Sequence, residues 1–269
     1  MAQSRRLVAS RFFAKYQAER SIYLLASEQA KDLIREILVN SPALIHAVTA
    51  RCKESASVKL KLSDKKYARP EDEFTDIIAA RVITYYRDHV PIISRALRES
   101  LEIDASKSVD KKLKLEIDDK FGYTSVHLIA RTKGSWATSP KYSALRGKWF
   151  EIQVRSILEH SWAEIEHEVV YKSGIDYTSH FKRRFARLAG AIEILEDEFA
   201  ALRDYQITLI SLYKEQYLNK QYLDKEIDSV RLLALLECER PSSLGWRKAS
   251  EIGTPFPAHI ENTCIIDPA

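Results

Sequence analysis

The sequence has few residues that interrupt regular structure, and few cysteines. Only seven Gly and eight Pro occur in 269 residues, which favours long helices over a loop-rich or all-β fold because both residues break regular elements. The three cysteines, Cys52, Cys238 and Cys264, lie far apart and show no CxxC spacing. We therefore expect neither a disulfide framework nor a zinc site, and this cysteine usage fits a reducing compartment.

Long apolar runs and a strong excess of one charge are also missing. No run approaches the roughly 18 apolar residues that a membrane-spanning helix needs. The arginines near the start are not followed by an apolar stretch long enough for a signal peptide. These absences predict a cytoplasmic protein without a membrane partner. The net charge of +4 permits phosphate binding but does not demand a nucleic-acid partner.

The composition that remains is typical of a globular protein. Hydrophobic residues make up 45% and charged residues 30% of the chain. The length suits one large domain, or one domain with a helical extension. We expect four parts: an N-terminal helical segment (1–40), a core (41–178), C-terminal helices (179–240) and an irregular tail (241–269).

Apolar periodicity in the core predicts alternating helices and strands. Residues 76–86 are nearly all apolar, which is typical of a strand buried on both faces in the middle of a sheet. The order predicts an α/β (α+β) fold, with a mixed β-sheet flanked by helices. We expect helices over 21–38, 57–66, 91–101 and 157–172, strands over 44–51, 76–86, 124–131 and 149–155, and loops or an exposed edge over 107–120 and 134–148.

A regular apolar stripe marks the start of the C-terminal helices. Its members are spaced alternately four and three residues apart, which is a heptad seam. A long helix with this stripe either packs on its own domain or associates with a partner, so a homo-oligomer would use the 181–209 helix. The stripe consists of Phe181, Phe185, Leu188, Ile192, Leu195, Phe199 and Leu202, with Leu209 one heptad further on.

Two expected strands each carry polar residues on one face. Alternation places Tyr123, Ser125 and His127 together on the first, and it places Glu151, Gln153 and Arg155 together on the second. Such side chains suit base stacking, phosphate binding and proton transfer. When each strand is read alone, a solvent-facing sheet or a ladder of ion pairs is the favoured explanation. The sequence therefore offers these residues as candidates.

Two carboxylates in the core suggest a divalent cation. Asp76 opens the most apolar strand, with Arg81 five residues on, and Glu151 lies on another strand. Carboxylates at one site repel unless a cation offsets them, and Mg²⁺ takes one or two carboxylates together with phosphates and water. Asp76 and Glu151 are thus candidate Mg²⁺ ligands for phosphoryl transfer.

The stretch RCKESASVKLK carries cations and a hydroxyl that suit a triphosphate. Arg51, Lys53, Ser57 and Lys61 are its candidates, and a solvated charge run is the alternative. No glycine-rich phosphate loop occurs, so any nucleotide would be held by side chains. His160 and His167 lie seven residues apart, unlike the HExxH spacing of zinc sites, which favours packing or hydrogen bonding.

Together these segments resemble RelA/SpoT-type (p)ppGpp synthetases over roughly residues 40–205. The matching stretches, in order, are RCKESASVKLK, DIIAAR, FGYTSVH and FEIQVRSILEHSWAEIEHEVVYK, and FKRRFARLAGAIEILEDEF resembles the helix that follows the family's core. The resemblance implies a nucleotidyltransferase-like synthetase core. It also implies Mg²⁺-dependent transfer of the β,γ-pyrophosphate of ATP to the 3′-hydroxyl of GDP or GTP.

The resemblance also implies roles for individual residues. Glu151 would take the acceptor's proton, and Asp76 would bind Mg²⁺ with it. Tyr123 would stack on guanine. Arg51, Lys53, Ser57, Lys61 and Arg81 would hold ATP, while Ser125, His127, Gln153, Arg155 and His160 would face the acceptor or its phosphates.

Departures from the family pattern leave the acceptor open. Ala79 stands where Gly is common, Ser156 replaces Thr, and Thr124 replaces a longer polar residue, which would affect acceptor choice. No HDxxED hydrolase motif occurs, which indicates a stand-alone synthetase. The alternatives are a toxin that modifies the 3′ end of tRNA or makes adenosine alarmones, and a non-enzymatic nucleotide sensor.

Overall fold

The protein is described from a computed structural model that covers residues 2–65, 67–110, 125–171, 179–219 and 228–238. Its chain divides into two compact units, Met1–Ala200 and Ala201–Ala269. All of the candidate site residues belong to the first unit. The second contains the end of the long helix α9 (Ser179–Leu218) and the helix α10 (Ser229–Cys238).

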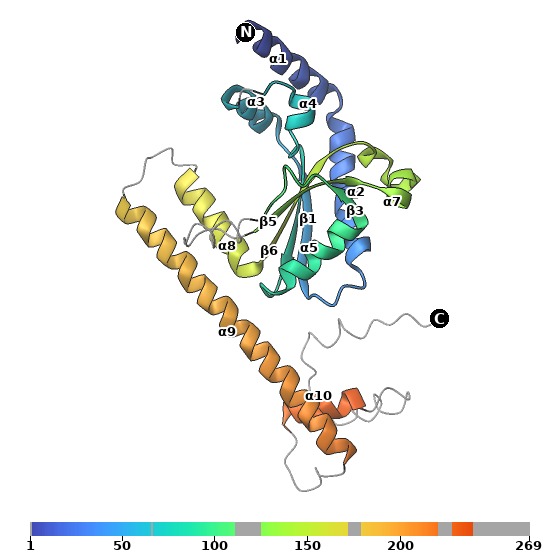
Figure 1. Ribbon diagram of the computed structural model, residues 1–269, viewed down its shortest axis with the longest axis vertical. Helices are drawn as coiled ribbons and strands as arrows, with labels where there is room; N and C mark the ends of the chain where they lie inside the picture. The colour runs from blue at the N-terminus through green and yellow to red at the C-terminus, as the bar shows by residue number, and fades with distance from the viewer. Residues whose placement is uncertain (1, 66, 111–124, 172–178, 220–227, 239–269) are drawn as a thin grey trace. The chain divides into compact units, whose positions relative to one another are not determined.

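A mixed β-sheet forms the centre of the first unit (Figure 1). Its strands lie in the order β1-β2-β6-β5-β3, and β4 also pairs with β5. Among the strands that the structure describes, only β2 and β6 pair in parallel, and the other pairs are antiparallel. The fold is thus α+β with a mixed sheet flanked by helices, as the sequence predicts. The strands are β1 (Ile45–Cys52), β2 (Ile78–Thr84), β3 (Leu101–Ile103), β4 (Val109–Asp110), β5 (Val126–Thr132) and β6 (Phe150–Ser156).

One face of the sheet is covered by two amphipathic helices, α2 (Arg20–Leu38) and α5 (His89–Ser100). Figure 1 shows them on the side opposite to α8 (Ile157–Glu166). Their apolar stripes meet alternate strand residues and close the main core, because successive strand residues point to opposite faces. Fully buried members of this core include Leu33, Ile34, Ile78, Ile93, Leu97, Leu128, Ile152 and Val154.

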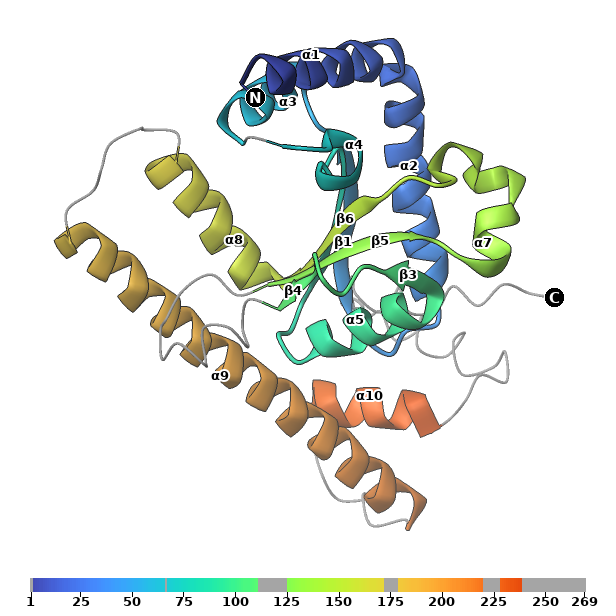
Figure 2. The same cartoon turned by 45° about the horizontal axis from the view of Figure 1, so that its top comes forward.

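A second, smaller core closes one end of the sheet. It joins α1 (Ala2–Ala18), α3 (Ser55–Asp64) and α4 (Pro70–Glu73) to the end of β1. Figure 2 shows these three helices gathered at that end. The members are Phe12, Tyr16, Cys52, Val58, Phe74 and Ile77. This cluster holds the segment that carries the candidate ATP-binding residues.

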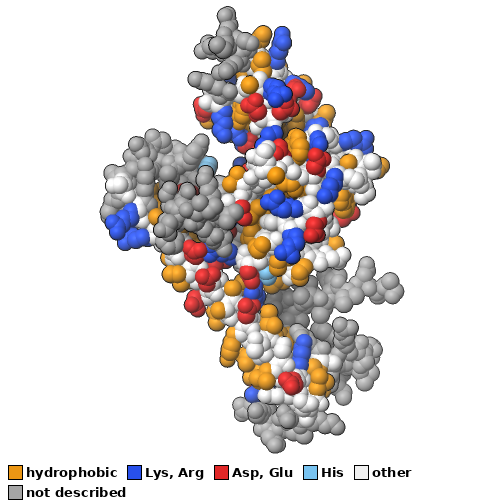
Figure 3. Space-filling view, viewed as in Figure 1, with side chains coloured by type: hydrophobic (Ala, Val, Ile, Leu, Met, Phe, Trp, Pro, Cys, Tyr) orange, Lys and Arg blue, Asp and Glu red, His pale blue; other side chains and the backbone are white. Residues whose placement is uncertain are grey.

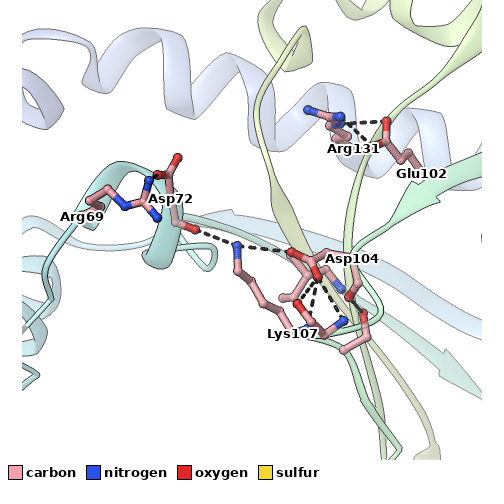
Figure 4. A network of polar contacts seen from close by, with 9 residues as sticks. Arg69, Asp72, Glu102, Asp104, Lys107 and Arg131 are labelled. Carbon is pink, nitrogen blue, oxygen red and sulfur yellow. Dashed lines mark hydrogen bonds and ion pairs between the residues drawn. The ribbon is translucent and has the colours of Figure 1, made fainter.

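The β3–β4 connection is fixed to α4 by one lysine. Lys107 donates from Nζ to the backbone oxygen of Asp72 at 2.9 Å and lies 3.2 Å from Oδ2 of Asp104 (Figure 4). Beside it, Arg131 and Glu102 form a two-pronged ion pair between β5 and β3. These contacts join an edge of the sheet to the helices at its end.

A capping box starts α8 directly after β6. Ser156 accepts from the backbone N–H of Glu159, and the Glu159 carboxylate accepts from the backbone N–H of Ser156 at 3.1 Å. The Ser156 hydroxyl also hydrogen-bonds the buried carboxyl of Glu196 on α9. This arrangement satisfies backbone donors at the helix start. It also fixes the first turn of α8 against both the sheet and α9.

The structure confirms each helix and strand expected in the core, with ends shifted by a few residues. The stretch 134–148 is not a plain loop, because it contains the short helix α7 (Gly134–Thr138) and a 3₁₀ helix, η1 (Pro140–Leu145). The short strands β3 and β4, each paired with β5, lie in the region expected as a helix end and an exposed loop or edge. The helix expected to reach residue 172 ends at Glu166 and continues as a π turn, η2 (His167–Tyr171).

The expected burial of 76–86 on both faces is only partly right. The strand covers Ile78–Thr84, and Asp76 lies in the turn before it. Ala79 and Arg81 are only partly buried, because they lie on the face opposite α2 and α5. No helix in the described part of the chain combines the length and apolar character needed to cross a membrane. The expected tail, 241–269, lies outside the described residues.

Candidate active site

Polar side chains lie in register across the three central strands. Arg81 on β2 pairs with Gln153 on β6, and Gln153 pairs with His127 on β5. One step along β6, Glu151 pairs with Ala79 and Ile129. Residues in register on adjacent strands share a face. His127 and Arg81 therefore share one surface with the polar face of β6.

A hydrogen-bonded cluster surrounds Glu151 at the middle of this surface. Nδ1 of His127 lies 2.7 Å from Oε1 of Glu151, and Nε2 of Gln153 donates to Oε2 at 3.0 Å. The His127 and Glu151 side chains are each 16% exposed. Both carboxylate oxygens are thus held in place on a largely buried residue. The two hydrogen bonds therefore fix the orientation of the Glu151 carboxylate.

Two opposing influences set the pKa of Glu151. Burial raises it, and the nearby Asp76 carboxylate raises it further. The hydrogen bond and charge of His127, together with the hydrogen bond of the Gln153 amide, lower the pKa more than burial and Asp76 raise it, so it lies below its ordinary value. Glu151 is therefore ionised at neutral pH and able to accept a proton or bind a cation.

Asp76 is held between two lysines at the end of the sheet. Nζ of Lys53 lies 2.8 Å from its Oδ2, and Nζ of Lys61 lies 2.6 Å from the same oxygen. The backbone N–H of Lys53 also donates to the carbonyl of Ile77 at 2.8 Å, which joins the two segments. Burial raises the pKa of Asp76, but the lysine hydrogen bonds outweigh it and keep the pKa low. Asp76 is thus an ionised carboxylate with two adjacent cations.

The donor set fits a Mg²⁺ ion whose remaining ligands are phosphate oxygens and water. Across the described residues, no group of three or more His, Cys, Asp or Glu side chains is placed to hold a metal. Oδ1 of Asp76, however, is buried and has no hydrogen-bond partner there. Asp76 and Glu151 also lie close enough for their charges to interact. Two carboxylates and one open oxygen match the partial protein shell of Mg²⁺ in phosphate sites.

A second cationic group lies where α8 faces the sheet. Oε1 of Glu164 lies 2.9 Å from Nη1 of Arg81, 3.5 Å from Nη2 of Arg155 and 3.9 Å from Nδ1 of His160. Arg155 is almost fully buried. Burial and the positive charge of Arg155 lower the pKa of His160, so its ring is neutral at neutral pH. Three residues expected from the sequence thus meet at one carboxylate.

Other expected residues lie apart from these groups. Arg51 on β1 and Ser57 on α3 are exposed, and Arg51 makes no ion pair in the described part of the chain. Ser125 lines a separate cavity of about 660 Å³ between α5 and α9, next to Glu196. Its hydroxyl is buried and has no hydrogen-bond partner among the described residues. Tyr123, expected to stack on a base, lies outside the described residues.

Two residues at the site were missed by sequence reasoning. Glu164 follows His160 by one helical turn, a spacing that indicates a shared face on α8. Tyr16 on α1 donates from its hydroxyl to the backbone oxygen of Lys53 at 2.5 Å and lies 3.6 Å from Sγ of Cys52. No local pattern in the sequence connects Tyr16 to Lys53, because the contact depends on how α1 packs against β1.

Comparisons with known proteins show which family and which solved structures the chain is similar to. The family described as a region found in RelA / SpoT proteins matches residues 50–176. The GTP pyrophosphokinase YjbM of Bacillus subtilis (strain 168) is 27% identical over 160 residues, which is 59% of this chain and 72% of YjbM. The small alarmone synthetase 1 of Bacillus subtilis has a similar structure, with a TM-score of 0.56 and 25% identity over 71% of this chain and 97% of that one.

Two further solved structures share the fold. A GTP pyrophosphokinase family protein from Streptococcus pneumoniae superposes with a TM-score of 0.57 at 24% identity, over 71% of this chain and 93% of that chain. Small alarmone synthetase 1 bound to its product pppGpp gives a TM-score of 0.56 at 24% identity, over 71% and 98%. Residues 50–176 of the chain therefore match the region found in RelA / SpoT proteins, in agreement with the resemblance of its motifs.

Proposed function

We propose that the protein is a pyrophosphokinase that transfers the β,γ-pyrophosphate of ATP to the 3′-hydroxyl of GDP or GTP. The observation that carries this proposal is the adjacency of two differently held carboxylates. Glu151 is oriented by His127 and Gln153, while Asp76 is flanked by Lys53 and Lys61. One carboxylate is ready to take a proton, and the other lies among cations that suit phosphates.

The proposed reaction joins the two substrates over this surface. The 3′-oxygen of the acceptor attacks the β-phosphorus of ATP, the bond between the β-phosphorus and the α,β-bridging oxygen breaks, and AMP leaves. The acceptor's proton passes to Glu151, whose lowered pKa keeps it ionised beforehand. Lys53, Lys61 and Arg81 would neutralise the triphosphate, and His127, Arg155 and the outlying Arg51 would contact phosphates. Positioning and charge neutralisation are the main requirements of phosphoryl transfer.

Asp76 and Glu151 would hold Mg²⁺ at the site. The ion would supply positive charge to the phosphate oxygens during transfer. The buried, unpartnered Oδ1 of Asp76 supports a ligand at this position. Lys53 and Lys61 both contact Oδ2, so they leave Oδ1 open.

The relatives support the reaction at the level of the family. YjbM is named a GTP pyrophosphokinase, and small alarmone synthetase 1 is named as binding pppGpp as its product. We propose that Tyr123 stacks on the acceptor base, with Gln153 and His160 at the border of the acceptor pocket. Ser57 would contact the ATP phosphates.

An assay with four acceptors in parallel tests the proposal. The full chain is incubated with γ-labelled ATP, Mg²⁺ and either GDP, GTP, ATP or bulk tRNA, and the products are separated by anion exchange or on gels. We expect label in ppGpp or pppGpp. Label in tRNA or in an adenosine alarmone instead would retain the chemistry and reject the guanosine acceptor. Absence of product with every acceptor would reject the pyrophosphokinase function.

The tRNA alternative has weak support from surface charge. Where Figure 3 colours the described residues on this face, Lys and Arg side chains are interspersed with acidic ones. Phosphate-backbone binding depends on clustered cations and falls steeply with salt. The tRNA arm of the assay is therefore repeated at two salt concentrations.

We further propose that any homo-oligomer forms through the 181–209 helix. Leu188, Leu195 and Phe199 on its heptad seam are 54%, 47% and 50% exposed. An apolar seam of this kind is buried when two helices associate. Light scattering of the full chain and of Leu195→Lys tests this. A species larger than a monomer that dissociates in the variant is expected, whereas a monomeric wild-type chain rejects the proposal.

A further inference from the structure

The carboxylate of Glu164 lies at the centre of a cationic group, and the proposed reaction assigns Glu164 no role. One of its oxygens, Oε1, contacts Arg81 at 2.9 Å and Arg155 at 3.5 Å, and it lies 3.9 Å from His160. The two arginines come from the adjacent parallel strands β2 and β6. A single helical side chain thus bridges two strands through their charges.

The burial of these partners is very unequal. The Arg155 side chain is 3% exposed, whereas the Glu164 side chain is 51% exposed. A buried guanidinium needs a nearby anion, because taking its charge out of water is costly. A half-exposed glutamate does not need its partner in the same way, since rotation about its side-chain bonds returns it to water. The carboxylate is therefore the replaceable member of the group.

A polyphosphate would compete with Glu164 for the same donors. Arg81 and Arg155 are among the residues proposed to contact phosphates, and the guanidinium N–H groups that face Glu164 cannot bond fully to both anions. A carboxylate left beside a phosphate would also repel it. Substrate binding at this position therefore requires Glu164 to move away or to lose charge.

We propose that Glu164 is a resident counter-anion, which neutralises Arg81 and Arg155 before substrate binds and is displaced by the phosphates of the incoming nucleotide. This inference rests on the proposed function for the identity of the polyphosphate. Glu164 is thereby a positioning residue that keeps two cations in place and lowers their affinity for phosphate. Removal of Glu164 should leave the two arginines less ordered in the free protein and should strengthen phosphate binding.

A purely structural role for Glu164 makes the opposite prediction. If the carboxylate only orients the arginines for phosphate, its loss disorders them and weakens binding. If it competes with phosphate, its loss frees both guanidinium groups and strengthens binding. The sign of the change in affinity therefore separates the two roles.

Calorimetric binding to the full-length chain measures this sign without any turnover. Inorganic pyrophosphate and ATP are titrated separately, with Mg²⁺ and no acceptor, into wild type and Glu164→Gln. We expect the Kd of the variant to be about tenfold lower, which corresponds to about 1.4 kcal/mol. Glu99→Gln is the matched control, since Glu99 is exposed on α5 and removes the same charge far from these arginines. Its Kd should equal that of wild type.

A second variant ties the effect to the arginines. In an Arg81→Gln background, the added Glu164→Gln change should lower the Kd much less than it does alone. One of the two cations for which Glu164 and phosphate compete is then already gone. An unchanged or higher Kd for Glu164→Gln overturns the inference, and so does an equal gain in the Arg81→Gln background. Circular dichroism confirms that each variant is folded.

The binding test of Glu164 and the activity test of the proposed function can fail independently. Tighter pyrophosphate binding by Glu164→Gln, in a protein that forms no product with any acceptor, would support the counter-anion and reject the reaction. Product formation by wild type, with weaker binding by Glu164→Gln, would support the reaction and reject the counter-anion. Failure of both proteins to bind pyrophosphate and ATP would show that these arginines form no polyphosphate site, and it would overturn the inference.

Discussion

The imidazole Nδ1 of His127 lies 2.7 Å from Oε1 of Glu151, on neighbouring antiparallel strands. Because the pKa of Glu151 is lowered and its carboxylate is ionised, this nitrogen carries the proton and donates. The hydrogen bond holds the carboxylate as an acceptor at the centre of the sheet surface. A charged, oriented and largely buried carboxylate is the arrangement that a general base needs.

Replacing Glu151 by Gln should stop turnover without unfolding the protein. The amide keeps the shape of the side chain and can still accept from His127, but it cannot take a proton or balance a cation. We expect a fall in kcat of about 10³-fold or more, measured with labelled ATP and the best acceptor. Glu102→Gln, which disrupts an exposed ion pair with Arg131, is the control and should retain most activity. Comparable loss in both variants would contradict the assignment.

Asp76→Asn should raise the Mg²⁺ concentration that the enzyme requires. The change removes a ligand charge and leaves Lys53 and Lys61 without their shared counter-ion. We expect the Mg²⁺ concentration for half-maximal rate to rise about 10- to 100-fold, the range seen when support of a bound metal is weakened. Initial rates over a Mg²⁺ titration measure it. Asp104→Asn, on the β3–β4 connection, should leave the Mg²⁺ curve unchanged.

The central part of this site was predictable because it follows from strand alternation. Glu151, Gln153 and Arg155 recur at every second position, and the register then brings His127 beside them. The resemblance of the motifs supplied what alternation does not, namely that two strands far apart in the chain form one surface. The His127–Glu151 contact therefore depends on the pairing of β5 with β6, and the sequence of neither strand alone predicts it.

The remaining features depend on packing that leaves no local pattern. The two-residue strand β4 is too short for periodicity to register, and β3 directly follows a helix. Ser125 was expected beside His127, yet it lines the cavity near α5, because β5 begins only at Val126 and strand alternation does not extend to Ser125. Tyr16 reaches Lys53 from a helix far away in sequence.

The protein should lose stability as the pH rises from acidic values to neutrality, owing to Glu196. Burial raises the pKa of this carboxyl to about 7, and the nearby Glu159 adds to the effect, while Ser156 and Arg87 oppose it. A carboxyl whose pKa is raised in the folded state favours folding in its protonated form. Its contribution is present below the ordinary pKa of about 4.3 and is lost as pH rises to about 7.

Glu196→Gln should remove this pH dependence. Glutamine keeps a hydrogen bond with Ser156 and carries no charge, so we expect a higher Tm than wild type at pH 8 and a similar Tm at pH 5. Thermal melts at both pH values provide the test. Glu198→Gln, two residues along on the exposed side of α9, is the control and should follow wild type at both. Parallel pH profiles for wild type and Glu196→Gln would show that Glu196 does not titrate in this range.

Tyr16→Phe should destabilise the end of the sheet that carries Lys53. The Tyr16 ring is 1% exposed, and its hydroxyl donates to the backbone oxygen of Lys53 at 2.5 Å. Burial raises the pKa of Tyr16 to about 12, so the hydroxyl remains a neutral donor across the working pH range. Phenylalanine fills the same space but leaves that carbonyl without the donor, which costs about 1–3 kcal/mol.

Two measurements check the effect of Tyr16→Phe. The urea midpoint should fall, and the KM for ATP should rise several-fold more than kcat falls, because Lys53 is displaced while Glu151 and His127 are untouched. Tyr85→Phe, whose ring is 49% exposed, is the matched control and should change neither value. A lower urea midpoint with an unchanged KM would mean that Tyr16 supports the fold alone, and that the position of Lys53 is set by its ion pair with Asp76.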